Sequence, residues 1–242
     1  MSRAPVSRAP VNRARVMTWN IHGAFGRNPR FDLGRVVALV KRHAPDIVAL
    51  QEIDSRRARE AHIGDPFDVL QQALGAHGAR ARAIVAADGE YGQALISRWP
   101  LVDTEIRDLS FPEREPRRAI CSDVATPFGP LRVIATHLGL SLHERRLQAA
   151  TLLGLLGALD RPTVALGDFN DWFWAGSVRR SLARVLPGCA RHRTFPSWLP
   201  MFQLDRVYLW PPQALLGSHT DPEARAISDH LPVIADIAVG LE

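Results

Sequence analysis

The chain has 242 residues, of which 46% are hydrophobic and 23% are charged, so it is long enough to bury a full core as one domain. No stretch approaches the roughly 18 consecutive apolar residues that a membrane-spanning helix needs, which excludes an integral helical membrane protein. The formal charge of +5 admits a polyanionic partner, but Lys41 is the only lysine, so an overall arginine bias explains the charge equally well.

The first residues have an arginine-rich and proline-rich composition, and residues 2–6 are repeated directly as residues 7–11. We expect residues 1–14 to form a disordered basic tail ahead of a single domain over residues 15–242. The tail contains no apolar segment suited to a secretory signal. Cys121 and Cys189 show neither metal-site nor disulfide-framework spacing, so we expect a reducing, cytoplasmic location.

Short runs rich in Val, Ile and Leu alternate with stretches of helical periodicity along the first half of the chain. Helix boundaries are marked by breakers such as Pro45. The pattern predicts strands at residues 16–21, 46–50, 81–85 and 93–97, and helices at residues 31–43 and 66–74.

In the second half, Pro and Gly between residues 126 and 130 predict a hairpin that joins strands at residues 119–125 and 131–137. The remaining elements are predicted as helices at residues 142–159 and 177–186, and strands at residues 163–166, 204–209 and 231–239. Hairpins mixed with helical crossovers favour an α/β fold with more than one sheet.

Carboxylate, amide and imidazole groups recur where the apolar strands terminate. The segments are Trp19-Asn20-Ile21-His22-Gly23, Leu50-Gln51-Glu52, Thr136-His137-Leu138, Gly167-Asp168-Phe169-Asn170 and Ser228-Asp229-His230. Burying such groups singly is costly, so we expect them to meet around a cation or a substrate. Oxygen ligands without a cysteine cluster indicate Mg²⁺, Mn²⁺ or Ca²⁺.

These segments, in this order, resemble the endonuclease/exonuclease/phosphatase superfamily over residues 16–239. The most specific elements are Gly167-Asp168-Phe169-Asn170 and Ser228-Asp229-His230, since the ordered set hardly arises by chance. The resemblance implies a DNase I-like α/β fold of four layers, in which two packed mixed β-sheets are flanked by helices. It also implies a metal-dependent hydrolase of phosphoric ester bonds, with the site at one edge of the sandwich.

Carried over by this resemblance, Glu52 is the main metal ligand, with Asn20 and Asp229 beside it. A cation held there polarises the phosphoryl group and shields the charge on its oxygens. The resemblance makes Asp168 the group that positions or deprotonates the attacking water, and Asn170 a donor to a phosphoryl oxygen.

The same resemblance makes His230 a contact to the scissile phosphate, and we expect Asp205 to orient it by a hydrogen bond. His137 is the second candidate imidazole; in some relatives of this superfamily it acts as an acid for the leaving group. Other histidines, His22 among them, show no partner pattern and are assigned to surface or core positions.

Two further positions are implied to bind substrate. Arg118 matches a position where an arginine contacts phosphate, and a guanidinium suits that role because it binds two oxygens at once. Arg117, its neighbour, fits the same position. Gln93 occupies a position where many relatives have Asn or Glu near the substrate.

Aromatic residues near the site are compatible with several substrates, so the identity of the substrate stays open. Three of them follow the Asp168 motif and others precede Asp205, namely Trp172, Phe173, Trp174, Phe195, Trp198 and Phe202. Such rings fit base stacking, peripheral contact with a lipid interface, or simple packing.

Residues 168–172 and 193–206 resemble a bacterial subgroup related to lipid-remodelling members of the superfamily. We therefore expect cleavage of a phospholipid or another small phosphodiester, with a DNA endonuclease, exonuclease or repair nuclease as the alternative. An inactive binding module would require a missing carboxylate, and every key acidic position is present.

Overall fold

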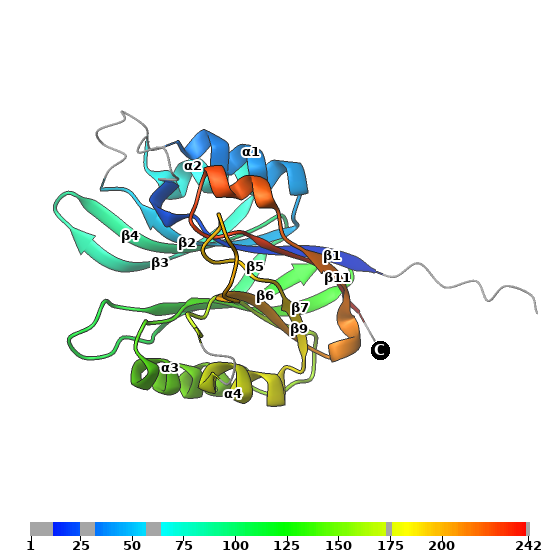
Figure 1. Ribbon diagram of the computed structural model, residues 1–242. Helices are drawn as coiled ribbons and strands as arrows, with labels where there is room; N and C mark the ends of the chain where they lie inside the picture. The colour runs from blue at the N-terminus through cyan, green and yellow to red at the C-terminus, as the bar shows by residue number, and fades with distance from the viewer. Residues whose placement is uncertain (1–11, 25–31, 57–63, 173–175, 241–242) are drawn as a thin grey trace, which may run out of the picture.

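The computed structural model describes residues 12–24, 32–56, 64–172 and 176–240, and it shows two packed β-sheets between two helical layers (Figure 1). The first sheet has the order β11 (Leu215–His219), β12 (Val233–Ala238), β1 (Arg13–Asn20), β2 (Ile47–Asp54), β4 (Gly89–Ser97) and β3 (His77–Ala86). The second has the order β5 (Leu101–Asp108), β6 (Arg118–Thr126), β7 (Gly129–His137), β8 (Thr163–Asp168), β10 (Asp205–Trp210) and β9 (Gly188–Arg191). The expected four-layer α/β sandwich is confirmed.

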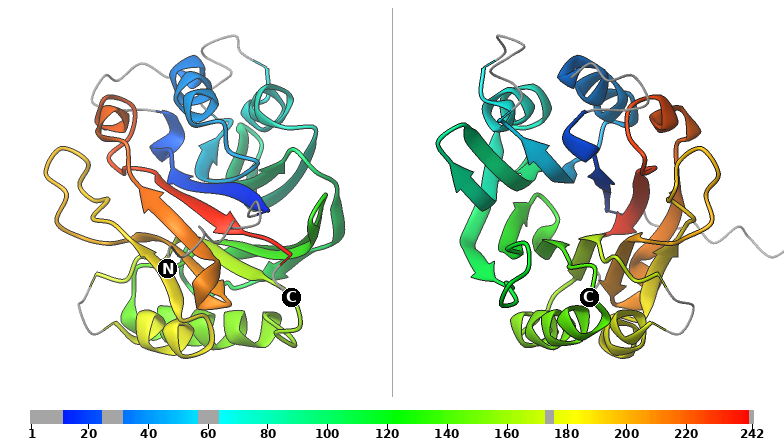
Figure 2. Two further views of the ribbon diagram at one scale, coloured as in Figure 1. Left: turned by 90° about the vertical axis from the view of Figure 1, so that its right-hand side faces the viewer. Right: turned by 60° about the vertical axis from the view of Figure 1, so that its left-hand side comes forward.

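Two helices cover the outer face of each sheet (Figures 1 and 2). They are α1 (Leu33–His43) and α2 (Pro66–Leu74) on the first sheet, and α3 (Leu142–Leu155) and α4 (Ser177–Val185) on the second. Three short 3-10 helices are described: His22–Ala24 after β1, Pro212–Ala214 after β10, and Pro222–Ala226 after β11. None of the described helices is long and apolar enough to cross a membrane.

Alternation along the strands builds three apolar layers. Val16 points between the sheets and packs in the same layer as Val133 and Val207, whereas its neighbour Met17 packs on the side of α1. On the far side of the second sheet, the Phe169 ring meets Tyr208 edge-on at 5.1 Å, beneath α3 and α4. Both sheets therefore have two apolar faces, and polar side chains collect where the strands end.

Every helix and strand that the sequence predicts has a counterpart in the fold, with shifts at the ends. The expected tail at residues 1–14 is wrong at its end, because β1 starts at Arg13, where backbone pairing with β12 begins. Residues 1–11 lie outside the described residues. Strands β5, β9 and β11 were not predicted; β5 is exposed along most of its length and lacks a clear apolar alternation.

The segment Ser228-Asp229-His230 was expected after a strand, but it precedes β12. It still reaches the same edge, because β12 runs antiparallel to β1 and its start lies beside the end of β1 (Figure 2). Asp205 likewise begins β10, which runs antiparallel to β8 and pairs Asp205 with Asp168. Strand direction therefore brings strand starts and strand ends to one place.

Candidate functional site

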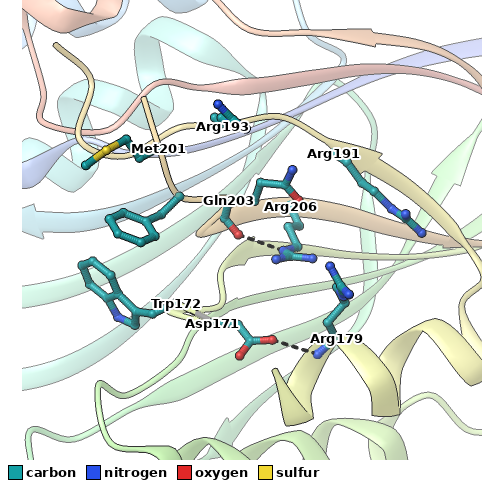
Figure 3. A pocket seen from close by; sticks show the side chains of 9 residues that line it. Asp171, Trp172, Arg179, Arg191, Arg193, Met201, Gln203 and Arg206 are labelled. Carbon is teal, nitrogen blue, oxygen red and sulfur yellow. Dashed lines mark hydrogen bonds between the residues drawn. The ribbon is translucent and has the colours of Figure 1, made fainter. Parts of the chain in front are cut away.

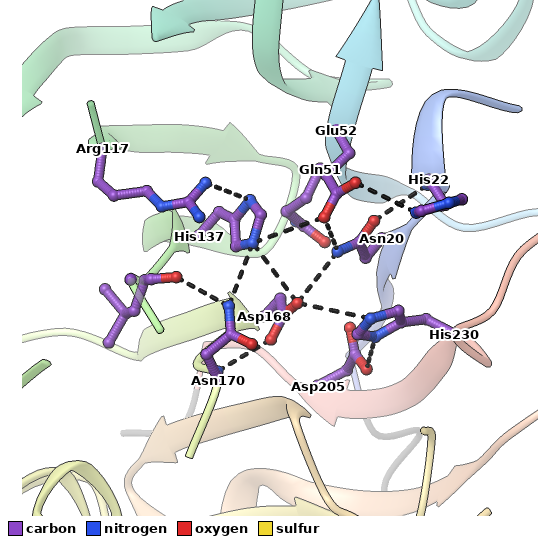
Figure 4. Close-up of polar contacts among 12 residues, drawn as sticks. Asn20, His22, Gln51, Glu52, Arg117, His137, Asp168, Asn170, Asp205 and His230 are labelled. Atoms are coloured by element: carbon purple, nitrogen blue, oxygen red, sulfur yellow. Dashed lines mark hydrogen bonds and ion pairs between the residues drawn. The ribbon is translucent and has the colours of Figure 1, made fainter. Parts of the chain in front are cut away.

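The side chains at this edge come from both sheets. β1 and β2 run parallel and end near Asn20 and Glu52, while β7 and β8 run parallel and pair His137 with Asp168. The Asn20 amide nitrogen joins the two groups, because it donates to Glu52 Oε1 at 2.7 Å and to Asp168 Oδ2 at 3.0 Å. The predicted residues of the two sheets thus form one polar cluster (Figure 4).

Asp168 lies at the centre of the cluster and is 1% exposed. Its Oδ2 atom is 3.6 Å from His137 Nε2 and 3.8 Å from His230 Nε2, and its Oδ1 atom accepts a hydrogen bond from the Asn170 backbone at 2.9 Å. Burial and the neighbouring Asp205 carboxylate raise the pKa of Asp168. A carboxylate with a raised pKa is better suited to accept a proton than an ordinary one.

Glu52 owes its position to an irregularity in β2. The pairing of β2 with β4 shifts register between Leu50 and Ile53, and Glu52 has a left-handed φ of 57°. Such a conformation is uncommon for a residue other than glycine and often marks functional positions. Although burial acts to raise the pKa of Glu52, hydrogen bonds from His22 and Asn20 and the charge of His137 lower it to about 2.

His22 belongs to the cluster, which corrects its assignment to a merely structural position. Its Nδ1 atom lies 3.5 Å from Glu52 Oε2 and 3.5 Å from Asp229 Oδ1. The contact with Glu52 raises the pKa of His22. A usable signal was its spacing, since His22 follows the strand-end residue Asn20 by two positions and its backbone N–H donates to the Asn20 side chain at 3.0 Å.

His230 is paired with Asp205 as the sequence predicts, at 2.8 Å between Nδ1 and Oδ2. Burial acts to lower the pKa of His230, but Asp205 and Asp168 outweigh it and raise the pKa to about 10. The Ser228 hydroxyl fixes this loop, because it donates to the Asn20 carbonyl at 2.7 Å and accepts from the His230 backbone at 3.1 Å. His230 is therefore a held, protonated imidazole in the neutral pH range.

His137 has the opposite charge state. Burial and the Arg117 guanidinium lower the pKa of His137 to about 4. Arg117 Nη1 lies 3.2 Å from His137 Nδ1, and because a guanidinium only donates, Nδ1 is the acceptor in this contact. The other ring nitrogen, Nε2, lies 3.6 Å from Asp168 Oδ2 and 3.3 Å from the Asn170 amide nitrogen. That amide donates to the Leu138 carbonyl at 2.9 Å.

The two predicted substrate-binding side chains lie beside the cluster. Arg118 bonds to Asp108 and to Ser110 Oγ, the latter at 2.8 Å, whereas its neighbour Arg117 contacts His137. Arg117 is thus the arginine that contacts the cluster, and the substrate-binding role of Arg118 stays a prediction. Gln93 is buried and donates to the Arg118 carbonyl at 2.6 Å, and its Oε1 atom has no hydrogen-bond partner among the described residues.

Two sets of groups at this edge have the chemistry to hold a cation. Ligand atoms of Asp168, Asp205 and His230 lie within 4.8 Å of one another, and all three residues are buried. The second set is the predicted one, Glu52 and Asp229 with the Asn20 amide, and its two carboxylates converge on His22.

Comparison with known proteins finds a matching family model and a relative of similar length. A family model described as the endonuclease/exonuclease/phosphatase family matches residues 17–230. The uncharacterized protein YbhP of Escherichia coli strain K12 is 30% identical over 241 residues, which cover 92% of this chain and 95% of YbhP.

Solved structures share the fold. An endonuclease/exonuclease/phosphatase from Beutenbergia cavernae superimposes with a TM-score of 0.73 at 22% identity, covering 95% of this chain and 72% of that one. The catalytic domain of human Nocturnin with bound sulfate gives 0.70 at 19% identity, covering 94% of each chain. Truncated Caenorhabditis elegans TDP2 gives 0.65 at 18% identity, covering 94% of this chain and 98% of that one. At these identities the likeness shows the architecture.

Proposed function

The chain belongs to the endonuclease/exonuclease/phosphatase family, and we propose that it is a divalent-metal-dependent phosphoesterase that hydrolyses a phosphodiester. The observation that carries the proposal is the buried Asp168 carboxylate, which faces the neutral imidazole of His137 on one side and the protonated imidazole of His230 on the other. This arrangement can take a proton from water and offer positive charge to a phosphoryl group.

The predicted ligand set fits a hard cation. Glu52 and Asp229 supply carboxylates and Asn20 an amide oxygen, and oxygen donors are what Mg²⁺, Mn²⁺ and Ca²⁺ prefer. The carboxylates of Glu52 and Asp229 remain partly exposed, at 23% and 39%, so water can complete a coordination shell. Both also converge on the His22 imidazole, and the contact with Glu52 raises the pKa of His22, as expected at a point that attracts positive charge.

We assign the other set, Asp168, Asp205 and His230, to proton and phosphoryl handling. The His230 imidazole is protonated in the neutral pH range and its Nδ1 atom bonds to Oδ2 of Asp205, so the ring has no lone pair for a cation while the pair is intact. A metal held by Glu52, Asn20 and Asp229 would supply charge stabilisation for the phosphoryl oxygens.

In the proposed reaction, Asp168 accepts a proton from water while the water oxygen forms a bond to phosphorus. The bond between phosphorus and the leaving oxygen breaks, and that oxygen takes up a proton from solvent water. The neutral His137 imidazole can donate a hydrogen bond to this oxygen but not a proton, because losing its remaining proton would leave an imidazolate. The His230 imidazolium and the Asn170 amide donate to the phosphoryl oxygens and stabilise their charge. Each of these groups lies within the cluster described above.

Exposed apolar side chains flank the cluster and favour a phospholipid as the source of the diester. Trp198, Leu199 and Met201 are each more than half exposed. They follow Phe195, whose ring lies 4.8 Å from that of His230. Apolar residues gathered on an exposed loop commonly mark a lipid or protein contact.

Trp172, by contrast, packs edge-on against Phe195 at 5.3 Å and Phe202 at 5.2 Å, so we infer a structural role for its ring. The other two aromatic residues of that segment, Phe173 and Trp174, lie outside the described residues. The lipid-contact hypothesis therefore rests on the loop that contains Trp198.

A direct test compares hydrolysis of bis-p-nitrophenyl phosphate, phosphatidylcholine vesicles, plasmid DNA and abasic duplex, with and without Mg²⁺. We expect diester cleavage that Glu52→Ala and Asp168→Ala abolish. Trp198→Ala should reduce cleavage of vesicles and spare the soluble diester, while Leu216→Ala, an exposed apolar control on β11, should affect neither.

Two other outcomes would revise the proposal. Salt-sensitive cleavage of DNA without cleavage of lipid would replace the phospholipid by nucleic acid as the substrate. Equal turnover by the wild type and both site variants would remove the enzyme hypothesis and leave a binding module of the same fold.

A further inference from the structure

A second polar feature lies on the outer side of the second sheet, next to the cluster but separate from it. It is a cavity of about 190 Å³ bounded by α4, β9, β10 and the chain on either side of them (Figure 3). Four arginines line it, namely Arg179, Arg191, Arg193 and Arg206. Figure 3 shows the guanidinium groups of Arg179, Arg191 and Arg206 on one side, opposite the Trp172 ring.

These four arginines differ from most others in the structure. Arg132 pairs with Asp123 at 3.0 Å and Arg15 pairs with Asp236 at 2.8 Å, and such pairs are common over the described surface. Within the described ranges, none of the four guanidinium groups that line the cavity forms an ion pair with a carboxylate. No described carboxylate therefore lies within ion-pair distance of these four guanidinium groups.

Arg206 is the most informative of the four, because it is only 2% exposed. Its Nε atom donates to the Gln203 carbonyl at 2.9 Å, and its buried Nη1 atom has no hydrogen-bond partner among the described residues. A buried cation without an anion is costly, and an unsatisfied donor adds to that cost. A bound anion would satisfy both the charge and the donor.

Among the described residues that line the cavity, Asp171 is the single acidic one, so four arginines against one carboxylate leave these side chains with a net charge of +3. The Oδ2 atom of Asp171 accepts the backbone N–H of Arg179 at 3.0 Å and so holds the first turn of α4. Its Oδ1 atom has no hydrogen-bond partner within the part of the chain that the structure describes. Even with this carboxylate present, the lining has a clear excess of positive charge.

The cavity adjoins the site through the backbone and through stacked rings. Arg206 directly follows Asp205 on β10, and alternation along the strand sends their side chains to opposite faces of the sheet. The Trp172 ring, which lines the cavity, touches Phe195, and Phe195 touches His230. The Trp172 and Phe195 rings therefore lie between the cavity and His230.

We propose that the arginine cavity binds an oxyanion of the phosphate class. Guanidinium groups bind two oxygens of one phosphate at once, and several around one space suit a group with more than one negative charge. The volume is below the roughly 300 Å³ of pockets that hold a complete drug-sized ligand, so a single phosphate-sized group fits better than a whole substrate.

Two sources can supply this oxyanion: a second phosphate carried by the substrate, or free inorganic phosphate. The first source rests on the proposed function, since it places the scissile diester at Asp168 and a second phosphate in the cavity. The experiment therefore has one arm that measures binding alone and one that measures turnover.

The binding arm titrates inorganic phosphate into the full-length, metal-free protein by calorimetry. Arg206→Met and the double variant Arg191→Gln/Arg193→Gln should each weaken phosphate binding by about tenfold to a hundredfold, the effect of losing a charge-assisted hydrogen bond. Arg184→Gln is the matched control, because Arg184 lies exposed on α4 and does not line the cavity. The double variant involves exposed side chains, so it keeps the test valid if Arg206→Met does not fold.

The turnover arm compares the p-nitrophenyl ester of thymidine 5′-phosphate with and without a 3′-phosphate. If the second phosphate enters the cavity, its presence lowers KM in the wild type, and the cavity variants lose that advantage while kcat for the unphosphorylated ester stays unchanged. If phosphate binding depends on the arginines and KM does not, the oxyanion is free phosphate.

Unchanged phosphate binding in both cavity variants would overturn the proposal. Intact phosphate binding with no turnover of these esters, of bis-p-nitrophenyl phosphate or of phosphatidylcholine vesicles would instead remove the proposed function and leave the oxyanion site standing. The two hypotheses can therefore fail separately.

Discussion

The Nδ1 atom of His230 lies 2.8 Å from Oδ2 of Asp205, on the side of the ring opposite Asp168. This contact fixes the ring orientation and the position of one proton. It also explains why a buried imidazole keeps its charge, since the pKa of His230 is raised from the ordinary value of 6.5 to about 10 despite burial. The positive charge of His230, which faces the proposed phosphate, therefore depends on Asp205, which lies on the other side of the ring.

Replacing Asp205 by Asn should make activity sensitive to pH. The amide keeps the shape but removes the main charge that raises the pKa of His230, so that pKa falls towards its ordinary value and the ring loses its proton as pH rises through neutrality. We expect the turnover of Asp205→Asn to decline between pH 6 and 9, where His230 of the wild type stays protonated. A pH series of kcat/KM on a soluble diester measures this.

Stability gives a second readout for the same pair. Because the folded-state pKa of His230 is raised, its contribution to the free energy of unfolding is complete below about pH 6.5 and is lost as pH rises towards 10. Denaturant unfolding of the wild type should show this loss, and Asp205→Asn should show much less of it. Parallel pH profiles for the two proteins would argue against the role given to Asp205.

Asp168→Asn should lower turnover by about 10²- to 10⁴-fold, the range typical for loss of a general base. The variant keeps a side-chain oxygen that can accept the Asn170 backbone N–H, so the fold should persist. Circular dichroism and the unfolding midpoint check that point, with Asp160→Asn as an exposed control. Retention of more than a tenth of the wild-type rate would remove Asp168 from the chemistry.

Metal binding should raise thermal stability in a way that depends on Glu52. A ligand at about 100 times its Kd stabilises a protein by about 2.7 kcal/mol, which corresponds to roughly 5–10 °C in Tm for a chain of this size. We expect that shift with Mg²⁺ or Mn²⁺ in the wild type and its loss in Glu52→Gln. Glu90→Gln, at a carboxylate that pairs with Arg82 away from the site, should respond like the wild type.

Local sequence patterns were sufficient to find the groups that end strands. Asn20, Glu52 and Asp168 each follow a buried apolar run, and their order along the chain resembles that of a known family. The pairing of His230 with Asp205 was also predicted, although the two residues are 25 positions apart. These predictions succeed because strand periodicity and strand ends are visible in the sequence.

The features that the sequence did not reveal depend on contacts across the fold. His22 joins Glu52 to Asp229 only because β2 and the loop before β12 both lie beside the end of β1. Arg117 and Arg118 are neighbours with the same chemistry, and the face each occupies depends on the register of the strand that begins there. The arginine cavity draws on three separate segments, so no single segment shows it.

Gly167 shows how closely the backbone must approach to place Asp168. It pairs with Thr136 across β7 and β8, its φ is +150°, and a Cβ atom there would lie 1.9 Å from the Thr136 carbonyl oxygen. Gly167→Ala should therefore force the two strands apart next to the His137–Asp168 pair. We expect a loss of more than about 4 kcal/mol in the free energy of unfolding, or no folded protein at all.

Gly129 provides the control that separates steric overlap from backbone strain. It also has a left-handed φ, of +117°, but a Cβ atom there would meet nothing within 4 Å. Gly129→Ala should therefore cost only the strain of that conformation, about 1–3 kcal/mol. Urea unfolding of the three proteins measures the difference, and similar losses in both variants would show that the close approach of Gly167 to Thr136 adds nothing beyond φ.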